Sequence, residues 1–343
     1  MRIALDATYT IDPHPSGIAI YSSELISGLA QMYPEDEFLY CYRAKQFRHA
    51  PRVLPSNVRR RLLSPPFTRF VADLFHSLNQ RVDRRPARKV ISTFHDLFVM
   101  TGEYSSPQFR ARFTEQARRA AKNSDLVIAV SEFTASQVTS LLGVERSRIR
   151  IVPHGVHPPP DKNEGDRENI ILFVGALQIR KNVERLVAAF ERVPGDWRLV
   201  LAGSPKGFRA NQISNRIEKS TARNRIQVRG YVSKPELESL YLRASVFAFP
   251  SLDEGFGIPV LEAMAHGLPV ITSNCSALRE VAADAALLVN PHVTEELESA
   301  LSRLIEDREL RRKLSDSGLS RARAYTWEKA VRATYSIYRE VLS

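Results

Sequence analysis

Short apolar segments alternate with segments of helical periodicity along the whole of this 343-residue chain. The apolar segments have the composition of buried strands and fall into two series. The first series comprises residues 2–8, 37–43, 73–78, 89–96, 125–131 and 149–156, and the second comprises residues 169–176, 197–204, 225–232, 245–251, 268–274 and 285–291. Such alternation predicts parallel sheets joined by right-handed helical crossovers. We therefore expect an α/β fold with two Rossmann-like domains.

A polar, proline-rich stretch separates the two series at residues 157–169. Because this composition is typical of a linker, we place one domain at residues 1–160 and the other at residues 166–326. The last segment, residues 327–343, has helical periodicity and is predicted to pack back on the first domain. The length of the chain is sufficient for two domains with full hydrophobic cores.

Composition argues against several classes of protein. No apolar stretch approaches the roughly 18–20 residues that a membrane-spanning helix needs. The chain begins directly with a strand-like segment and shows no signal peptide. Its two cysteines, Cys41 and Cys275, are far apart and lack metal-ligand spacing. We therefore expect a cytoplasmic protein without structural zinc.

The chain has a net charge of +11, and its densest basic clusters lie in the first half, at residues 59–61 and 81–89. Clusters of this kind attract nucleic acid, an anionic membrane surface or a substrate that carries a diphosphate. The alternative is a basic face that is simply solvated. No zinc-finger, RNA-recognition or helix-turn-helix signature accompanies the clusters, so nucleic acid is the least favoured partner.

Residues 249–267, FPSLDEGFGIPVLEAMAHG, constrain the chemistry more tightly than any other segment. An apolar strand at residues 245–249 leads into a glycine-rich turn, and the helix that follows ends at Gly267. Open α/β sheets bind nucleotide phosphates at such junctions. Glu254 lies in the turn and Glu262 about one turn into the helix, where a ligand over the strand end is within reach. The alternative is a surface loop with one exposed and one capping glutamate.

Arg180 and Lys181 follow another strand and its Gly175, just ahead of a helix. Arginine offers a planar fork of donors, lysine a point charge, and a helix start adds free N–H groups. The pair is therefore predicted to clamp a diphosphate, although adjacent basic residues are also common on surfaces. The segment matches neither the Walker A loop nor the GxGxxG fingerprint.

The end of a third strand offers a place for a nucleobase. The backbone at Tyr231 and Val232 is expected at the carboxyl edge of the second sheet, where such ligands bind. Ser233 and Glu236 come next and form a capping box that opens the following helix. Ser233 is therefore predicted to have a structural role.

The order and spacing of several motifs resemble those of one protein family. The succession FVGALQIRKN, LAGS, GYVSKPELESLY, FPSLDEGFGIPVLEAMAHGLPVI and REVAADAALLVNP covers nearly all of residues 170–292. It is similar to the donor domain of the family 4 retaining glycosyltransferases, which have the GT-B fold. The resemblance implies two Rossmann-like domains that face each other across a cleft. It also implies transfer of a sugar from a nucleotide diphosphate sugar with retention of anomeric configuration.

The resemblance assigns roles to matched residues of the second half. Glu254 is expected to contact hydroxyls of the transferred sugar near the reacting carbon, and Glu262 to accept hydrogen bonds from the ribose. Arg180 and Lys181 would neutralise the diphosphate leaving group. Backbone N–H groups of the glycine-rich turn would hold the sugar or a phosphate, and they belong to Gly255, Phe256 and Gly257. Ala283 stands where many relatives have glycine, and we expect little consequence.

In the first half, DPHPSGIAIYSSEL resembles the family's N-terminal loop and helix, where Gly17 lets the backbone approach the donor phosphate. The resemblance gives His95, at a strand end, contact with the transferred sugar or a phosphate oxygen. The alternative for His95 is a capped strand end. His154 stands where relatives usually have asparagine, so the role of that position is open. Three residues are assigned to the acceptor side, namely His76, Asn79 and Asp96.

These observations predict a retaining hexosyltransferase that acts on a glycan or lipid-linked acceptor in polysaccharide synthesis. The sequence contains no D-x-D pair, so Arg180, Lys181 and helix N–H groups are expected to stabilise the leaving group without a metal or another cofactor. The FHDL and VPHGV elements are most similar to bacterial mannosyltransferases of surface polysaccharides, which implies GDP-mannose as the donor. UDP-glucose or another UDP-hexose is the alternative.

The basic first domain favours a lipid-diphosphate-linked acceptor and peripheral contact with the inner face of an anionic membrane. Two different functions are left open. A phosphorylase of the same fold would cleave a disaccharide with inorganic phosphate. A non-catalytic basic protein would bind membranes or nucleic acid.

Overall fold

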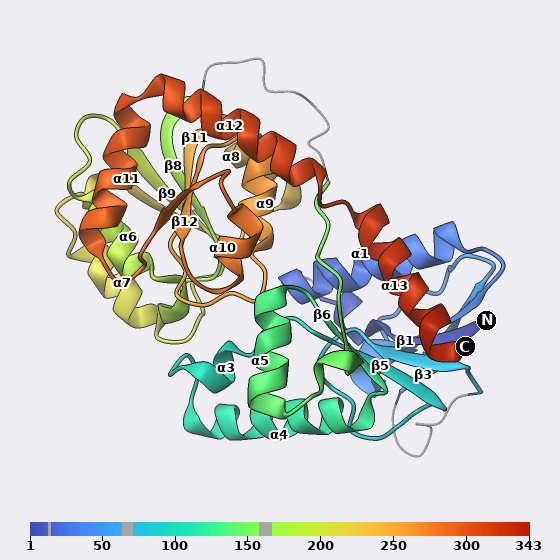
Figure 1. Cartoon of the computed structure of the whole chain (residues 1–343). Coiled ribbons are helices and arrows are strands. Elements are labelled where there is room, and N and C mark those ends of the chain that lie inside the picture. The colour runs from blue at the N-terminus through green and yellow to red at the C-terminus, as the bar shows by residue number, and fades with distance from the viewer. Residues whose placement is uncertain (13–14, 64–70, 158–166) are drawn as a thin grey trace. The chain divides into compact units, whose positions relative to one another are not determined.

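The computed structural model describes residues 1–12, 15–63, 71–157 and 167–343. It divides into two compact units: unit 1 comprises Met1–Gly155 with Thr326–Ser343, and unit 2 comprises Val156–Tyr325. Each unit has a central sheet with helices around it (Figure 1). Most of the expected linker, with the expected domain bounds at 160 and 166, lies outside the described residues.

Unit 1 is built on a seven-stranded sheet with the order β3-β2-β1-β4-β5-β6-β7, and its described pairings are all parallel. Its strands are β1 (Arg2–Asp6), β2 (Glu37–Tyr42), β3 (Val58–Leu62), β4 (Leu74–Ser77), β5 (Lys89–Phe94), β6 (Leu126–Ala129) and β7 (Ile149–Ile151). Its helices are α1 (Gly17–Met32), α2 (Ala44–Phe47), α3 (Phe98–Thr101), α4 (Pro107–Asn123), α5 (Glu132–Leu142) and α13 (Trp327–Leu342), with 3-10 turns η1 (Ala7–Thr10) and η2 (Arg146–Arg148). Apolar residues of these parallel strands are buried from both faces, as expected for a covered sheet.

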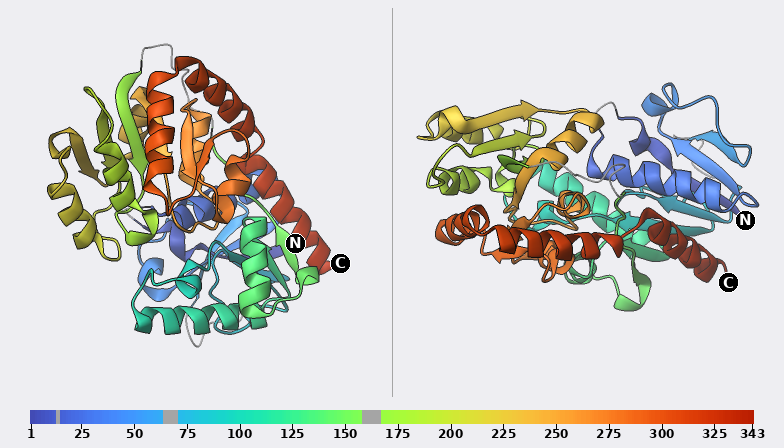
Figure 2. Two further views of the ribbon diagram at one scale, coloured as in Figure 1. Left: turned by 60° about the vertical axis from the view of Figure 1, so that its left-hand side comes forward. Right: turned by 90° about the horizontal axis from the view of Figure 1, so that it is seen from above.

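Unit 2 has a six-stranded sheet with the order β10-β9-β8-β11-β12-β13, again with parallel pairings throughout the described residues. Its strands are β8 (Glu168–Val174), β9 (Arg198–Ala202), β10 (Ile226–Gly230), β11 (Ala244–Phe249), β12 (Val270–Ser273) and β13 (Leu287–Val289). Its helices are α6 (Val183–Phe190), α7 (Ala210–Glu218), α8 (Lys234–Arg243), α9 (Ile258–Ala265), α10 (Ser276–Ala282), α11 (Thr294–Glu306) and α12 (Arg308–Arg323), with turns η3 (Ile179–Lys181) and η4 (Arg223–Arg225). Figure 2 shows both sheets from two further directions. The α/β class with two parallel sheets is confirmed.

Strand β3 is an element that the sequence analysis does not predict. Its sequence is VRRRL, and the arginines at 59–61 indicate a basic cluster rather than a strand. In the structure this segment pairs with β2 and forms one edge of the sheet. Charged residues are typical of edge strands, because they discourage pairing with another chain. Because arginine occupies three of its positions, the apolar content of this segment is too low to indicate a strand.

The C-terminal helix α13 is part of the hydrophobic core of unit 1. Trp327, Val331 and Tyr338 belong to the same buried cluster as Leu25 of α1. Gly155 allows this close approach, because a Cβ atom at that position would lie 2.2 Å from the backbone N of Trp327. The end of the chain thus completes the core of the unit in which the chain begins.

A buried polar chain connects α13 to the sheet and to α1. His76 on β4 is fully buried; its Nδ1 lies 2.6 Å from the Tyr338 hydroxyl and its Nε2 lies 2.8 Å from Oγ1 of Thr93. The Thr93 hydroxyl is 3.0 Å from the hydroxyl of Tyr21 on α1. Burial lowers the pKa of His76 to about 3, so its imidazole is neutral in the folded protein.

Ala283 follows α10 in a backbone conformation that suits glycine. Its φ is 48° and its ψ is −124°, which lies outside the small left-handed region open to residues with a Cβ atom. Strain of this kind costs about 1–3 kcal/mol. Strain at this position would run against the expectation that alanine has little consequence here, which stays a prediction.

We predict that His76→Gln changes the pH dependence of stability. Below its ordinary pKa of 6.5 the imidazole binds a proton in the unfolded chain but not in the folded one, so the free energy of unfolding falls as the pH drops from 6.5 toward 3. His76 contributes up to about 1.4 kcal/mol per pH unit to that fall. Urea unfolding across this range should show a shallower slope for His76→Gln, while the exposed control His49→Gln should keep the wild-type slope. Equal slopes for wild type and His76→Gln would contradict the prediction.

Ala283→Gly should raise the free energy of unfolding by about 1 kcal/mol, because it removes the strain at this positive φ. Ala324→Gly is the matched control at the end of α12, where φ is −72°. At this position glycine only increases the conformational entropy that is lost on folding. The free energy of unfolding should therefore fall by about 0.5–1 kcal/mol. Chemical denaturation measures both changes. A loss of stability in both variants would contradict strain at Ala283.

Candidate active site

Glu254 lies at the centre of a buried ion cluster in unit 2, which consists of Arg180, Lys181 and Glu254. Its Oε1 atom is 2.5 Å from Lys181 Nζ and 2.8 Å from Arg180 Nη1. The same oxygen accepts a hydrogen bond of 2.6 Å from Ser251 Oγ. The side chains of the three ions are only 7–11% exposed. Three of the four predicted catalytic residues are thus in direct contact.

Adjacent strands position the ion cluster. Arg180 lies in the turn η3 after β8, and Glu254 follows β11, which pairs with β8. The two loops are also joined directly, because Leu252 N donates to Arg180 O at 2.8 Å and Arg180 Nη1 donates to Asp253 O. The carboxyl ends of parallel neighbours meet at one edge of a sheet, so residues distant in the sequence come together there.

Asn182 and Ser251 are site residues that the sequence analysis misses. Asn182 Nδ2 donates to Pro250 O at 3.0 Å and to Pro291 O at 2.7 Å, and so ties three loops together. Its φ of 57° is a conformation that asparagine tolerates better than most residues. In the sequence, only their positions point to these two residues. Asn182 directly follows Arg180 and Lys181, and Ser251 directly follows the Phe-Pro pair at the end of an apolar strand.

The ion cluster combines a permanent carboxylate with an excess of positive charge. Burial raises the pKa of Glu254, but Arg180, Lys181 and the accepted hydrogen bonds outweigh it and lower the pKa to about 2. Two cations therefore face one carboxylate at neutral pH. Because the site is shielded from water, its attraction for an anion is stronger than at an exposed surface. The arrangement suits a ligand with both hydroxyl groups and phosphates.

The glycine-rich turn after Glu254 has a shape that its sequence requires. Gly255, Phe256 and Gly257 are buried, and Gly257 has a φ of 104°. A Cβ atom at Gly257 would lie 2.6 Å from Cδ2 of Leu278. The positive φ therefore favours glycine, and a larger residue would also have to displace the Leu278 side chain. The role of this turn in holding a sugar or phosphate stays a prediction.

Glu262 and the nucleobase candidates occupy two neighbouring parts of unit 2. Glu262 on α9 accepts a hydrogen bond of 2.9 Å from the hydroxyl of Tyr241 on α8. Burial raises the pKa of Glu262, against the effect of that bond. Tyr231 is 46% exposed and Val232 partly buried just after β10. The capping box predicted next to them is present, and their ligand contacts stay predictions.

His95 is buried in unit 1 with its tautomer determined by its neighbours. Its Nε2 lies 2.8 Å from the carbonyl oxygen of Leu78, so this nitrogen carries the proton and donates. Its Nδ1 lies 3.4 Å from Nε2 of His154. Burial lowers the pKa of His95 to about 4, and the ring is neutral. Such a histidine can contact a sugar hydroxyl but supplies no fixed positive charge to a phosphate.

The other predicted residues of unit 1 have separate environments. Gly17 is the first residue of α1, next to its N-cap Ser16. Asn79 is buried and accepts a hydrogen bond from the following backbone N–H, while Asp96 is partly buried. His76 is 0% exposed, and both of its ring nitrogens are engaged within the core. The acceptor-side expectation for His76 is wrong, because its ring reaches no surface.

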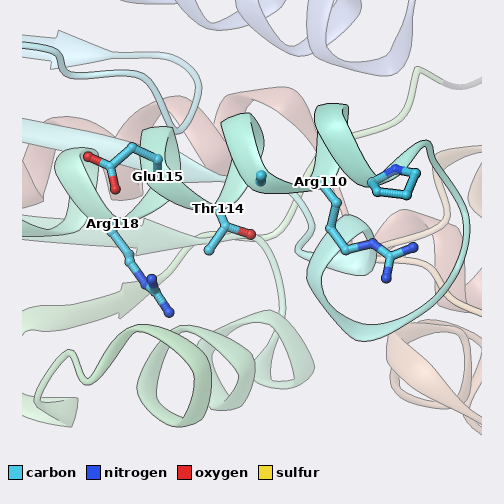
Figure 3. A pocket seen from close by; sticks show the side chains of 6 residues that line it. Arg110, Thr114, Glu115 and Arg118 are labelled. Carbon is cyan, nitrogen blue, oxygen red and sulfur yellow. The ribbon is translucent and has the colours of Figure 1, made fainter.

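A hollow of about 390 Å³ lies along the surface of α4 (Figure 3). Figure 3 shows Thr114 between Arg110 and Arg118, with Glu115 on the same side as Arg118. Its lining residues are Pro107, Arg110, Ala111, Thr114, Glu115 and Arg118. None of them was a predicted site residue, and the hollow extends the basic character of unit 1 to this helix.

The described ranges contain neither a membrane-spanning helix nor a cluster of metal-binding residues. No helix in these ranges is both long and apolar enough to cross a membrane. In the same ranges, no group of three or more histidine, cysteine or acidic residues is arranged to hold a metal ion. Metal independence stays a prediction, because it concerns the reaction and not only the residues.

Two family models match consecutive parts of the chain. Residues 15–158 match Glycosyltransferase Family 4, and residues 159–321 match Glycosyl transferases group 1. O-antigen chain mannosyltransferase B of Escherichia coli is 29% identical over 283 residues, which are 78% of this chain and 74% of that protein. The MMP alpha-(1->4)-mannosyltransferase of Mycolicibacterium hassiacum is 30% identical over 242 residues, which are 67% of this chain and 58% of that protein.

Solved structures share the fold. Sucrose-phosphate synthase from Thermosynechococcus elongatus has a TM-score of 0.80 at 23% identity, covering 99% of this chain and 98% of that one. Anabaena HepE in complex with UDP and glucose has a TM-score of 0.76 at 15% identity, and the match covers 99% of this chain and 100% of that one. These similarities show the GT-B fold. Because the two family models match in order from residue 15 to residue 321, the chain belongs to the family 4 glycosyltransferases.

Proposed function

We propose that this protein is a retaining, metal-independent hexosyltransferase that moves mannose from GDP-mannose to a hydroxyl of a glycan or lipid-linked acceptor. The observation that carries the proposal is the buried ion cluster of Arg180, Lys181 and Glu254. Family membership supports sugar transfer, and the printed activity of the Escherichia coli relative, O-antigen chain mannosyltransferase, supports mannose and polysaccharide synthesis. A UDP-hexose is the alternative donor, because UDP and glucose occupy the structure of Anabaena HepE.

The proposed chemistry follows from the charges of the ion cluster. When the bond to the diphosphate breaks, negative charge develops on the leaving group and positive charge on the sugar carbon. Arg180 and Lys181 stabilise the diphosphate, since preorganised cations in a buried site require no reorganisation during reaction. Glu254 is ionised and held by three donors, so it accepts hydrogen bonds from hydroxyls of the transferred sugar. No step in this scheme needs a metal.

Retention of configuration has two routes in this scheme. In one, Glu254 attacks the reacting carbon as the diphosphate leaves, and the acceptor hydroxyl then displaces Glu254 from this covalent intermediate and gives up its proton to a leaving-group oxygen. In the other, the acceptor hydroxyl attacks from the face that the diphosphate leaves, and a leaving-group oxygen takes its proton. Strong contacts to Arg180 and Lys181 reduce the nucleophilicity of the carboxylate, which favours the second route.

We also propose that unit 1 makes peripheral contact with the inner face of an anionic membrane through α4. This helix carries five basic residues against one acidic residue. Phe109 at its start is 43% exposed. An exposed aromatic ring beside cations is typical of helices that bind membrane interfaces. Such contact would place the enzyme where a lipid-linked acceptor is available.

The donor base is tested by thermal unfolding in the presence of GDP, UDP and ADP and their sugars. GDP and GDP-mannose should raise the unfolding temperature, because a ligand that binds only the folded state stabilises it. A shift with UDP alone would replace mannose transfer by UDP-hexose transfer. If no nucleotide gives a shift, the transferase proposal fails. Release of sugar phosphate from a disaccharide and inorganic phosphate would then identify the phosphorylase alternative.

Glu254→Gln is predicted to lower the turnover number by about 100-fold or more, because one preorganised charged contact in a buried site is lost. The assay measures GDP release from GDP-mannose. The exposed Glu295→Gln on α11 is the matched control and should keep the wild-type rate. Binding of GDP by thermal shift verifies that the variant is folded. A wild-type turnover number in folded Glu254→Gln would contradict a catalytic role.

A further inference from the structure

The two carboxylate oxygens of Glu254 have different surroundings. Lys181 Nζ and Ser251 Oγ donate hydrogen bonds of 2.5 and 2.6 Å to Oε1, and Arg180 Nη1 lies 2.8 Å from the same atom. Oε2 accepts no hydrogen bond from the residues that the structure describes, and it is not one of their fully buried unpaired atoms. The protein therefore holds one oxygen and leaves the other available to a ligand.

The two cations alone do not account for this orientation. A guanidinium and a carboxylate favour two parallel hydrogen bonds, one to each oxygen. Here Arg180 and Lys181 both make their closest approach to Oε1. Ser251 is the uncharged donor that contacts this oxygen as well, and a third donor on Oε1 favours the orientation that is observed.

Neighbouring strands on both sides fix the position of Ser251. It lies two residues beyond the end of β11 and is 0% exposed. Its carbonyl oxygen accepts a hydrogen bond of 2.6 Å from Oγ of Ser273, the last residue of β12. The backbone N–H of Leu252 donates to the carbonyl oxygen of Arg180, which follows β8. The hydroxyl of Ser251 is thus held in place by the sheet itself.

The proton of the Ser251 hydroxyl belongs to the bond with Glu254. The hydroxyl oxygen lies 2.6 Å from Glu254 Oε1, 3.1 Å from the carbonyl oxygen of Arg180 and 3.5 Å from that of Asp253. A hydroxyl has a single proton to donate. Hydrogen bonds to an ionised acceptor are shorter and stronger than those to a neutral carbonyl, so the carboxylate receives it.

A bound diphosphate changes the balance of forces at Oε1. Arg180 and Lys181 then attract the phosphates as well as Glu254, and their hold on the carboxylate weakens because like charges compete for them. The Ser251 hydroxyl carries no charge, so a phosphate does not draw it away from Oε1. Among the three groups on this oxygen, Ser251 is the one whose contact does not depend on the state of the donor site.

We infer that Ser251 is a positioning residue whose hydroxyl keeps Oε2 of Glu254 turned toward the transferred sugar while Arg180 and Lys181 hold the diphosphate. The inference rests on the proposed function and adds to it a residue that acts through Glu254. Hydrogen bonds that stabilise a transition state require groups that are already in place. Ser251 therefore affects the turnover number rather than the binding of the nucleotide.

The first test measures GDP release from GDP-mannose by the full-length protein. Ser251→Ala should lower the turnover number about tenfold, because one hydrogen bond to a charged group is lost. The thermal shift with GDP should keep its wild-type size, which also verifies that the variant is folded.

Ser245→Ala is the matched control for Ser251→Ala. Ser245 is a buried serine at the other end of β11, and its Oγ donates a hydrogen bond of 2.6 Å to the carbonyl oxygen of Glu168. This variant loses a comparable hydroxyl without touching the ion cluster, so it should keep the wild-type turnover number. Equal losses of turnover in both variants would reduce the effect to lost stability and overturn the inference.

A double variant separates positioning from an independent role. In protein that carries Glu254→Ala, the further change Ser251→Ala should not lower the turnover number again, because the carboxylate that Ser251 positions is already gone. A further tenfold loss in the double variant would show that Ser251 acts without Glu254, which contradicts the inference.

A crystal structure of Ser251→Ala tests the orientation of Glu254 without any reaction. Once the hydroxyl is missing, Arg180 and Lys181 should turn the carboxylate until both of its oxygens contact a cation. An Oε2 atom that stays unpaired, as in the wild type, overturns the inference even if the enzyme transfers sugar. Wild-type protein that binds no nucleotide and turns over no nucleotide sugar overturns the proposed function instead, and a turned carboxylate in the variant then still supports Ser251 as the residue that orients Glu254.

Discussion

Parallel strand pairing is the constraint on which the candidate active site of this protein depends. In a parallel sheet the carboxyl ends of neighbouring strands lie at one edge, and loops from distant parts of the chain meet there. In unit 2 this brings Arg180, after β8, within 2.8 Å of Glu254, after β11. In unit 1 it brings Arg43, after β2, next to Asp6 at the end of β1. The chemistry of each unit is therefore a consequence of strand order.

The charged groups at the carboxyl edges of the two sheets differ in net charge and in how tightly they are paired. Arg180 and Lys181 contact a single carboxylate at hydrogen-bond distance, so the ion cluster is both ordered and positive. At the carboxyl edge of the unit 1 sheet, Arg43 and Arg81 lie near Asp6 and Asp83 at longer distances. A buried, positive site such as the ion cluster suits a diphosphate leaving group.

Much of the fold followed from local patterns. Apolar segments identified the strands of both sheets except β3, whose three arginines hide an edge strand. Capping chemistry identified the start of α8, and the motif around Glu254 identified a strand, a turn and a helix in the right order. These patterns are local, because each depends on the burial or the backbone preference of a few successive residues. His76 shows where local patterns fail. The sequence around a histidine in a strand does not tell whether its side chain is buried in the core or lies at the surface, and His76 is buried.

Local sequence patterns were enough to predict the fold class, the order of elements and the residue types of the candidate active site, because periodicity and turn chemistry act over short stretches of chain. Which of those residues are in contact became clear only from the folded chain. It joined Glu254 to Arg180 and Lys181, enclosed His76 against Tyr338 of the last helix, and placed Ala283 at a positive φ. The physical reason is that contacts between residues far apart in the chain depend on strand order and packing. Neither is encoded in any single motif.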